Sequence, residues 1–324
     1  MDDTLTIPQA SGTVRLVERA AAYAKVSYAK NTSKAYESDL RVFKEWCEKQ
    51  NVPFLPTSQE VLACYVAHLA DIGRKVSTIS RAVSTINTAH RDADLPLPKG
   101  TVLENTMSGI RRTFGTKTKQ KAPVLPDDLR AMVAVCSDDL VGHRNRLLLV
   151  MGFCGAFRRS ELVAMRVEDV VRVRQGLEVT LRKSKTDQEG RGRTVALPRS
   201  SDSSMCPEAL FLKWLEVSGV TSGYLFRDTR YYCPTKEVQT FSEEPMKGDS
   251  VAKIVKGLAR KAGLENAEDI SGHSLRAGLV TAAAEAGRTS ISIRRTTGHK
   301  SDKMVDLYVR SSDMWKDNAA KGLL

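Results

Sequence analysis

A short basic stretch at residues 115–123 divides this chain of 324 residues into two parts. It reads Gly-Thr-Lys-Thr-Lys-Gln-Lys-Ala-Pro, with lysines at alternate positions and a proline at its end. Closely spaced like charges favour solvent, and the residue before a proline is disfavoured in a helix, so we expect an extended, exposed linker. The sequence therefore predicts two domains, residues 12–114 and 124–324, each long enough to bury its own core.

The formal net charge of the chain is +12, and it is spread over both parts. Residues 1–121 carry 18 of the 50 basic and 12 of the 38 acidic side chains, which leaves 32 and 26 for the remainder, so each part has a net charge of +6. Two basic domains joined by a linker indicate a clamp around a polyanion such as nucleic acid. A generally basic soluble protein is the alternative that charge alone leaves open.

The sequence also disfavours several classes of protein. No apolar run approaches the roughly 20 residues that a membrane-spanning helix needs. The N-terminus, Met-Asp-Asp-Thr-Leu-Thr, does not resemble an export signal. The six cysteines are scattered without a Cys-x-x-Cys pair, which indicates reduced thiols and not zinc ligands or a disulfide framework. We therefore expect a cytoplasmic protein that does not bind membranes.

Residues 12–114 carry apolar side chains at helical spacing in five successive segments, which predicts a helical bundle. The predicted helices cover residues 12–29 and 31–50 and then begin at Thr57, Ser77 and Thr101. The third and fifth of these helices open with capping boxes, Thr57-x-x-Glu60 and Thr101-x-x-Glu104. The fourth helix is expected to expose a polar face made of Arg81, Ser84, Thr88 and Arg91.

Residues 124–324 mix helical patterns with one strand pair. We expect helices from Pro126, over residues 140–153, 207–217 and 250–262, and as one long run between His273 and His299. Residues 177–182 and 193–197 are rich in β-formers and flank a glycine-rich tip, which is typical of a β-hairpin. Residues 228–247 show no clear period. The predicted fold is mainly α with a small antiparallel β-sheet in the C-terminal domain.

The C-terminal part of the chain holds a set of polar residues that suits a phosphate. His273 and Arg276 lie three residues apart at the start of the helical run, so both project from one face. An arginine offers a fork of donors, and an imidazole adds a donor or a proton shuttle. His299 follows a glycine, and Tyr308 needs a cationic surround and a proton acceptor to act as a nucleophile. Taken singly, each residue is typical of a surface pair or of helix packing.

Further polar residues lie upstream. Arg158 stands at the head of a short helical segment with Glu161 three residues on, a spacing that also suits an ordinary ion pair within one helix. Lys185 begins the tip of the predicted hairpin, where a lysine is commonly just solvated. Metal-ligand spacing is absent among the histidines and their acidic neighbours, Glu285, Asp302 and Asp306. This absence argues against a metal-dependent nuclease.

The order arginine, lysine, His-x-x-Arg, Gly-His and tyrosine resembles the signature of the tyrosine recombinase (phage integrase) family, over roughly residues 30–310. Within that family, the framework resembles Cre-like site-specific recombinases most. The framework segments are Asn31-Thr32, Glu45-Trp46-Cys47, Leu95-Pro-Leu-Pro98, Trp214–Gly219 and Tyr224-Leu-Phe226. One residue departs from Cre, which has tryptophan at the position of His299. Most of the wider family has histidine there, as this chain does.

The resemblance implies a helical core-binding bundle followed by a mixed α+β catalytic domain. It implies that Tyr308 is the nucleophile and Lys185 the general acid, and that Glu161 orients its neighbours. The remaining implied catalytic residues, which bind the scissile phosphate, are Arg158, His273, Arg276 and His299. No cofactor and no metal are implied. The candidate DNA-contact residues are Lys75, Arg81, the linker lysines Lys117, Lys119 and Lys121, and, on a helix expected in the major groove, Lys253, Lys256 and Arg260.

The implied activity is site-specific recombination of double-stranded DNA through a 3′-phosphotyrosyl intermediate. The implied partners are short inverted-repeat sites, each bound by a dimer, and a second dimer that completes a homotetramer. Residues 314–324 form an apolar tail that packs in cis or, by the resemblance, passes to a neighbouring subunit. The implied location is the cytoplasm of a bacterium, on DNA of the nucleoid or of a phage. A type IB topoisomerase-like nicking-closing enzyme and a catalytically silent DNA-binding protein are the alternatives.

Overall fold

The structure is a computed structural model that describes residues 30–116, 121–182, 192–228, 242–299 and 301, together with Arg19 and Tyr23. The chain divides into two compact units, Met1–Lys119 and Gln120–Leu324, with the boundary inside the predicted linker. Each unit contains its own hydrophobic core. Of the helices in the described ranges, none combines the length and the apolar composition that crossing a membrane requires.

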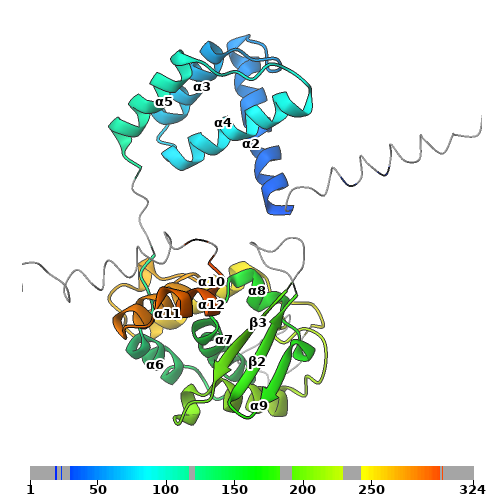
Figure 1. The fold of residues 1–324 in the computed structure, drawn as a ribbon, viewed down its shortest axis with the longest axis vertical. Helices are drawn as coiled ribbons and strands as arrows, with labels where there is room; N and C mark the ends of the chain where they lie inside the picture. The colour runs from blue at the N-terminus through cyan, green and yellow to red at the C-terminus, as the bar shows by residue number, and fades with distance from the viewer. Residues whose placement is uncertain are drawn as a thin grey trace, which may run out of the picture. The chain divides into compact units, whose positions relative to one another are not determined.

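The described part of the N-terminal unit is helical (Figure 1). Its helices are α2 (Lys30–Gln50), α3 (Gln59–Asp71), α4 (Val76–Asp92) and α5 (Thr101–Phe114). α3 packs against α4 and α5, and α2 packs against α4. Aromatic rings fill the space between α2 and α3, where the ring centroids of Phe43 and Trp46 lie 4.7 and 5.1 Å from that of Tyr65. Most of the helix predicted for residues 12–29 lies outside the described residues.

The two predicted capping boxes of this unit are wrong. The N-cap of α3 is Ser58, whose hydroxyl accepts a hydrogen bond from the Val61 backbone N–H at 3.3 Å. Thr57 is buried instead, and its backbone N–H donates to Nε2 of His90 on α4 at 3.0 Å. The N-cap of α5 is Gly100, and no side chain caps that helix. This bond ties the segment before α3 to α4, and it uses the backbone N–H that Glu60 would need in the predicted capping box.

The polar face predicted for α4 is only partly exposed. Arg81, Ser84 and Arg91 are exposed as predicted, but Thr88 is buried. The Thr88 hydroxyl donates to the Ser84 carbonyl at 3.0 Å and accepts from Nη2 of Arg91 at 3.3 Å. Because these bonds within the helix satisfy the hydroxyl, the side chain can be buried at little cost.

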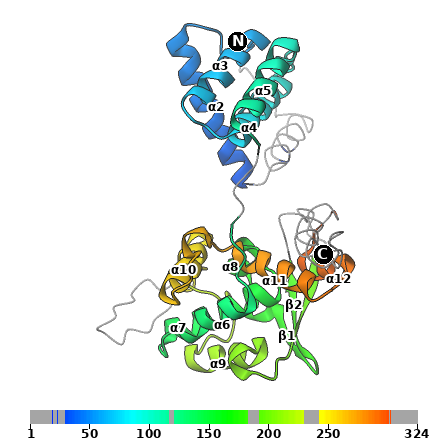
Figure 2. The same ribbon diagram turned by 90° about the vertical axis from the view of Figure 1, so that its left-hand side faces the viewer.

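The C-terminal unit packs helices mainly to one side of a small sheet (Figure 2). The helices are α6 (Pro126–Ala134), α7 (Leu140–Cys154), α8 (Arg159–Ala164), α9 (Pro207–Ser218), α10 (Gly248–Lys261), α11 (Ser274–Glu285) and α12 (Ser290–Thr297). The strands are β1 (Val170–Val173), β2 (Gly176–Leu181) and β3 (Arg193–Pro198). They form an antiparallel sheet in the order β1-β2-β3, in which Val179 pairs with Val170 and Val195. The predicted hairpin of β2 and β3 is confirmed, and the four-residue strand β1 was not predicted.

α7 is the central helix of the C-terminal core. Residues 147–151 are fully buried, as expected for a helix that is apolar on most sides. α6, α9 and α11 pack against it, with α9 and α11 on different sides (Figure 2). On α9, the Trp214 indole is fully buried and donates to the Leu225 carbonyl at 3.1 Å. Since α7 leads into α8 within a few residues, this core holds the start of α8 in place.

The single helix predicted between His273 and His299 is wrong, because the segment forms α11 and α12 with a break at residues 286–289. Gly287 in the break has a φ of +72°, in the left-handed region that favours glycine and ends helices. Thr289 then caps α12 with its hydroxyl, which accepts a backbone N–H of the first turn. α12 packs against both α11 and β3. Because of the break, α12 packs against α11 and does not extend it.

Candidate active site

Arg158 and Glu161 form an ion pair at the start of α8. The Arg158 backbone N–H donates to Oε2 of Glu161 at 2.9 Å, and its Nη1 donates to Oε1 at 2.7 Å. Glu161 is only 3% exposed, so the pair is shielded from water. Charge-assisted hydrogen bonds are stronger in such a shielded place than in water. The ordinary ion pair that the spacing allowed is therefore present. It also fixes the direction of the Arg158 guanidinium.

Arg276 is a buried arginine in the first turn of α11, with an exposure of 2%. Its Nη1 donates to the Ala156 carbonyl at 2.7 Å, two residues before Arg158. Ala156 has a φ of +47°, which is uncommon for a residue with a Cβ. An arginine keeps its charge when buried, and the loss of hydration costs several kcal/mol unless other groups offset it. The fold thus holds a positive charge inside the unit, close to Arg158.

His273 is the N-cap of α11 and lies beside the same arginines. Its edge is exposed, yet enough protein surrounds the ring for desolvation by burial to be the largest cause of a lowered pKa. The charges of Arg276, Arg158 and Arg159 lower that pKa further. A pKa below the usual value of 6.5 keeps His273 neutral at pH 7 and able to accept a proton.

His299 follows Gly298, the C-cap of α12, and its ring is half-buried. Burial is the largest cause that lowers its pKa to about 4, followed by the charges of Arg276, Arg158, His273 and Arg193. Nδ1 lies 2.8 Å from the hydroxyl of Thr297, which is fully buried. In the tautomer in which Thr297 donates to Nδ1, the proton of the neutral ring is on Nε2. His299 then offers an N–H donor at neutral pH.

Four of the predicted site residues therefore converge from three places in the sequence. Arg276 is bonded to the Ala156 carbonyl, two residues before Arg158, and the charges of both arginines act on both His273 and His299, so the four groups lie near one another. Lys185 and Tyr308 lie outside the described residues. Within the described ranges, no three His, Cys, Asp or Glu side chains gather as a possible metal site. Two guanidinium forks and two imidazoles can serve one anion.

Two residues of this region were not predicted from the sequence, Thr297 and Arg193. Arg193 begins β3, and its Nη1 donates to the Thr296 carbonyl at 2.6 Å. Its register carries a signal, because it shares a strand face with the buried residues Val195 and Leu197. An arginine in phase with the apolar side of a strand indicates a buried polar contact. Thr297 has no comparable signal, since its role depends on the turn that follows α12.

The predicted DNA contacts of the N-terminal unit differ in their surroundings. Arg81 forms a two-point ion pair with Asp39 of α2, at 2.8 and 2.9 Å, and so ties α4 to α2. Lys75 is exposed at the N-cap of α4. Of the linker lysines, Lys121 is exposed, and Lys117 and Lys119 lie outside the described residues.

Two of the three predicted DNA-contact residues on α10 form ion pairs with one glutamate. Glu268 binds Nζ of Lys256 at 2.8 Å and accepts two hydrogen bonds from Arg260, at 2.7 and 3.1 Å. The hydrogen bonds from Arg260, which contribute most, and from Lys256 lower the pKa of Glu268 to about 2. Lys253 is exposed on the same helix. Of the three predicted DNA contacts on α10, two therefore have a carboxylate partner in the structure.

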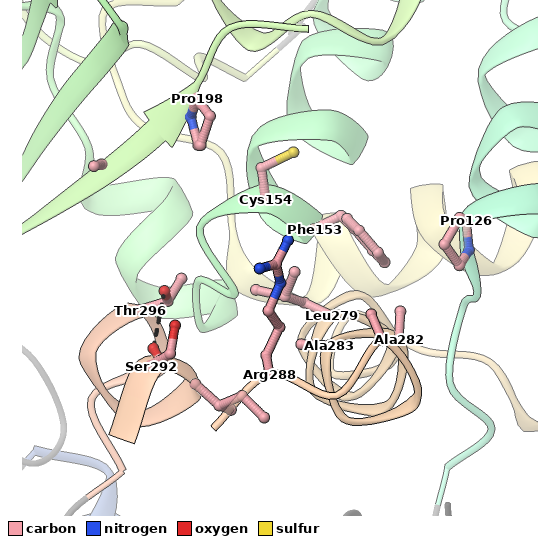
Figure 3. Close-up of a pocket in the computed structure, with 13 residues that line it drawn as sticks. Pro126, Phe153, Cys154, Pro198, Leu279, Ala282, Ala283, Arg288, Ser292 and Thr296 are labelled. Atoms are coloured by element: carbon pink, nitrogen blue, oxygen red, sulfur yellow. Dashed lines mark hydrogen bonds between the residues drawn. The ribbon is translucent and has the colours of Figure 1, made fainter. Parts of the chain in front are cut away.

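A pocket of about 390 Å³ lies between α7, β3, α11 and α12 (Figure 3). Apolar residues line most of it, namely Phe153, Leu279, Ala282, Ala283 and Ile293. Figure 3 shows Arg288 extending toward Phe153 and Cys154. None of the four converging residues lines this pocket, so it is a second feature of the same unit.

Comparisons with known proteins agree with this geometry. The profile of the phage integrase family matches residues 124–314, and that of the phage integrase N-terminal SAM-like domain matches residues 23–93. An integrase/recombinase xerD homolog of Selenomonas ruminantium is 37% identical over 311 residues, which cover 94% of this chain and 89% of that protein. A tyrosine recombinase XerD of Rickettsia bellii is 23% identical over 292 residues, which cover 88% of this chain and 90% of that protein.

The fold is similar to that of the XerH site-specific recombinase, whose structure is a post-cleavage complex with a palindromic difH substrate. The TM-score is 0.68 at 18% identity, over 90% of this chain and 79% of that one. The chain therefore belongs to the phage integrase family, as its motifs predicted, and it has the predicted two-domain fold of tyrosine recombinases. Membership of a Cre-like branch stays a prediction.

Proposed function

We propose that this protein is a site-specific DNA recombinase that cleaves and rejoins DNA through a 3′-phosphotyrosyl intermediate on Tyr308. The observation that supports this most is the convergence of Arg158, His273, Arg276 and His299. Phosphoryl transfer spreads negative charge over the equatorial oxygens of the transition state, so fixed cations and N–H donors there lower the barrier. Family membership and a basic composition support DNA as the substrate.

Each residue has a role in the proposed reaction. Arg158 and Arg276 donate to the non-bridging oxygens of one phosphate. The Tyr308 oxygen bonds to phosphorus as the bond from phosphorus to the 5′-oxygen breaks. The phenol proton goes to His273, and the leaving 5′-oxygen takes a proton from Lys185. Because one phosphate ester replaces another, the reverse reaction rejoins the strand without ATP or a metal.

The lowered pKa values of both histidines fit these roles. A neutral His273 can accept the phenol proton, which a histidine already protonated at pH 7 cannot do. A neutral His299 with Nδ1 engaged by Thr297 donates from Nε2 to the phosphate. Glu161 holds the Arg158 guanidinium in direction, and therefore acts through its neighbour and not on the phosphate.

A nicked suicide duplex tests the reaction directly, because the cleaved fragment diffuses away and the covalent complex accumulates. We expect a protein–DNA adduct with the native chain and none with Tyr308→Phe, at equal DNA binding. A bound duplex carrying the correct site that gives no adduct would support the silent DNA-binding protein. The site itself can be selected from a random pool, and we expect an inverted repeat, as in the palindromic substrate of XerH.

The proposed assembly is a homotetramer on two DNA sites, with a dimer on each. The domain of residues 12–114 and the catalytic domain of residues 124–324 form the clamp on each half-site, with residues 115–123 as the linker between them. A ring closes when each subunit passes an element to the next, and we propose residues 314–324 for that element. The apolar pocket beside α12 has a size and lining that suit Trp315 or Leu323. Removal of residues 314–324 should abolish synapsis and leave binding to single sites.

Product topology separates recombination from simple relaxation. On a plasmid with two copies of the selected site, a recombinase yields inverted or excised products. A type IB topoisomerase-like enzyme yields only relaxed circles of the original sequence. We expect recombined products, on DNA of a bacterial cell or of its phage.

A further inference from the structure

Arg193 makes three contacts with two separate parts of the candidate active site. From the start of β3, its Nη1 donates to the Thr296 carbonyl at 2.6 Å, in the last turn of α12. Its Nη2 lies 3.9 Å from Oε2 of Glu161 on α8. Its guanidinium also lies against Gly298, where an added Cβ would come within 3.0 Å of Cζ and Nε. One side chain thus touches the partner of Arg158 and the turn that carries His299.

The position is an unusual one for an arginine. The side chain is 21% exposed and lies in phase with Val195 and Leu197, which are buried. Among the described residues, Nε and Nη2 are buried without a hydrogen-bond partner. A valine or leucine at this register would fill the same face without the cost of burying a charge. The charge and the fork of Arg193 therefore need a reason beyond packing.

We propose that Arg193 is a positioning residue, which fixes the Arg158–Glu161 pair and the His299 turn relative to each other. This inference rests on the proposed function, because the distance between those two groups matters only if both bind one phosphate. Arg193 holds the turn through the Thr296 carbonyl and attracts Glu161 by its charge. Misplacement of a catalytic group by about 1 Å can cost about a hundredfold in rate.

The glycine before His299 follows from the same contact. Gly298 has a φ of +67°, and the Arg193 guanidinium occupies the space that a Cβ would need. Gly219, the C-cap of α9, has a φ of +65° with open space around it. An alanine at either position meets the same backbone penalty, but only the alanine at 298 pushes on Arg193. The two glycines are a matched pair.

The first experiment measures single-turnover cleavage of the suicide duplex and DNA affinity for Arg193→Gln. The control is Arg199→Gln, because Arg199 follows the other end of β3 and pairs with Glu208, away from the four converging residues. We expect cleavage to fall about a hundredfold for Arg193→Gln at unchanged affinity, and to change less than threefold for Arg199→Gln. Arg193→Lys keeps the charge but loses the fork, so its cleavage rate should lie between those of Arg193→Gln and the native chain. Equal cleavage by native chain and Arg193→Gln would overturn the proposal.

The second experiment needs no DNA and separates positioning from general damage to the fold. Nuclear magnetic resonance titration of labelled histidines should show a higher pKa for His299 in Arg193→Gln, since a neighbouring cation is lost, and little change for His273. Gly298→Ala should slow cleavage far more than Gly219→Ala at a similar loss of thermal stability. An unchanged His299 titration, or equal cleavage by the two alanine variants, would contradict the proposal. If the native chain forms no adduct, the proposed function fails, while the titration still decides whether Arg193 acts on His299.

Discussion

Two glutamates in the C-terminal unit each have two arginine neighbours, and the surroundings of these clusters differ. Glu208, at the start of α9, accepts hydrogen bonds from Arg172 and Arg199 at 2.6 to 3.1 Å. Glu161, at the start of α8, is bonded to Arg158 at 2.7 Å, but Arg193 stays 3.9 Å away. The arginine side chains of the Glu208 cluster are 57% and 54% exposed, against 17% and 21% in the Glu161 cluster.

This difference separates a structural cluster from one prepared for a ligand. In the Glu208 cluster, short bonds engage both arginines, and water surrounds their outer faces, so the ion pairs are screened and individually weak. In the Glu161 cluster, the cations are withdrawn from water and a third arginine, Arg276, is buried nearby. Positive charge there exceeds what Glu161 can neutralise. A DNA phosphate is the anion that the proposed function supplies.

The largest expected effect concerns the arginine fork at the site. Arg276→Lys keeps the charge but loses the planar fork, so transition-state contacts are lost while most of the DNA interface remains. We expect single-turnover cleavage to fall about a thousandfold, with DNA affinity changed less than threefold. Arg199→Lys is the matched change in the Glu208 cluster and should leave cleavage near the native rate. Similar losses in both variants would erase the distinction between the clusters.

The second prediction compares the two glutamates by stability. Glu161→Gln removes the charge that faces Arg158 and Arg193 in a buried place, and should lower the free energy of unfolding by about 3 kcal/mol. Glu208→Gln leaves its arginines solvated and should have a much smaller effect. Urea unfolding of the DNA-free proteins measures both. Both glutamates are buried, so a larger loss for Glu208→Gln would show that the burial of the arginines does not set the strength of these pairs.

The third prediction concerns pH. The unfolded chain protonates His299 near pH 6.5, whereas burial and the adjacent arginines lower the pKa in the folded chain to about 4. The unfolded state therefore binds more protons between these values, and stability should fall as the pH falls from 6.5 toward 4. His273 contributes in the same direction. In His299→Gln, the decline of the urea midpoint over this range should be shallower, and an identical decline would contradict the lowered pKa.

The smallest expected effect concerns DNA contacts on α10. If α10 faces DNA, Lys253→Ala should reduce the slope of log affinity against log salt by about one, because one phosphate contact is lost. Lys256→Ala should reduce it less, since Glu268 already neutralises part of that charge. Fluorescence anisotropy over a range of salt concentrations measures the slopes. Equal reductions would mean that Glu268 releases Lys256 when DNA binds.

The sequence predicted those parts of the fold whose patterns are local. The apolar run of α7, the proline that begins α6 and the β-formers of the hairpin each specify their element through neighbours in the chain. The motifs also predicted which residues gather, because spacing and order matched a known family. Arg158, His273, Arg276 and His299 do lie together.

Features that depend on contacts between distant segments were missed. Thr57 would be a good cap by spacing, but His90 takes its backbone N–H, and Ser58 becomes the cap. The break between α11 and α12 depends on one glycine that the helical pattern conceals. Arg193 looks like an ordinary strand residue until α12 and α8 pack beside it.

The central claim is that the converging arginines and histidines serve one scissile phosphate next to Tyr308. The most direct test is to trap the adduct on a suicide duplex carrying the selected site, digest the protein and identify the DNA-linked peptide by mass spectrometry. Of the eight tyrosines in the chain, only Tyr308 should carry the 3′-phosphate. An adduct on another residue, or none on a bound and correct site, would contradict the account.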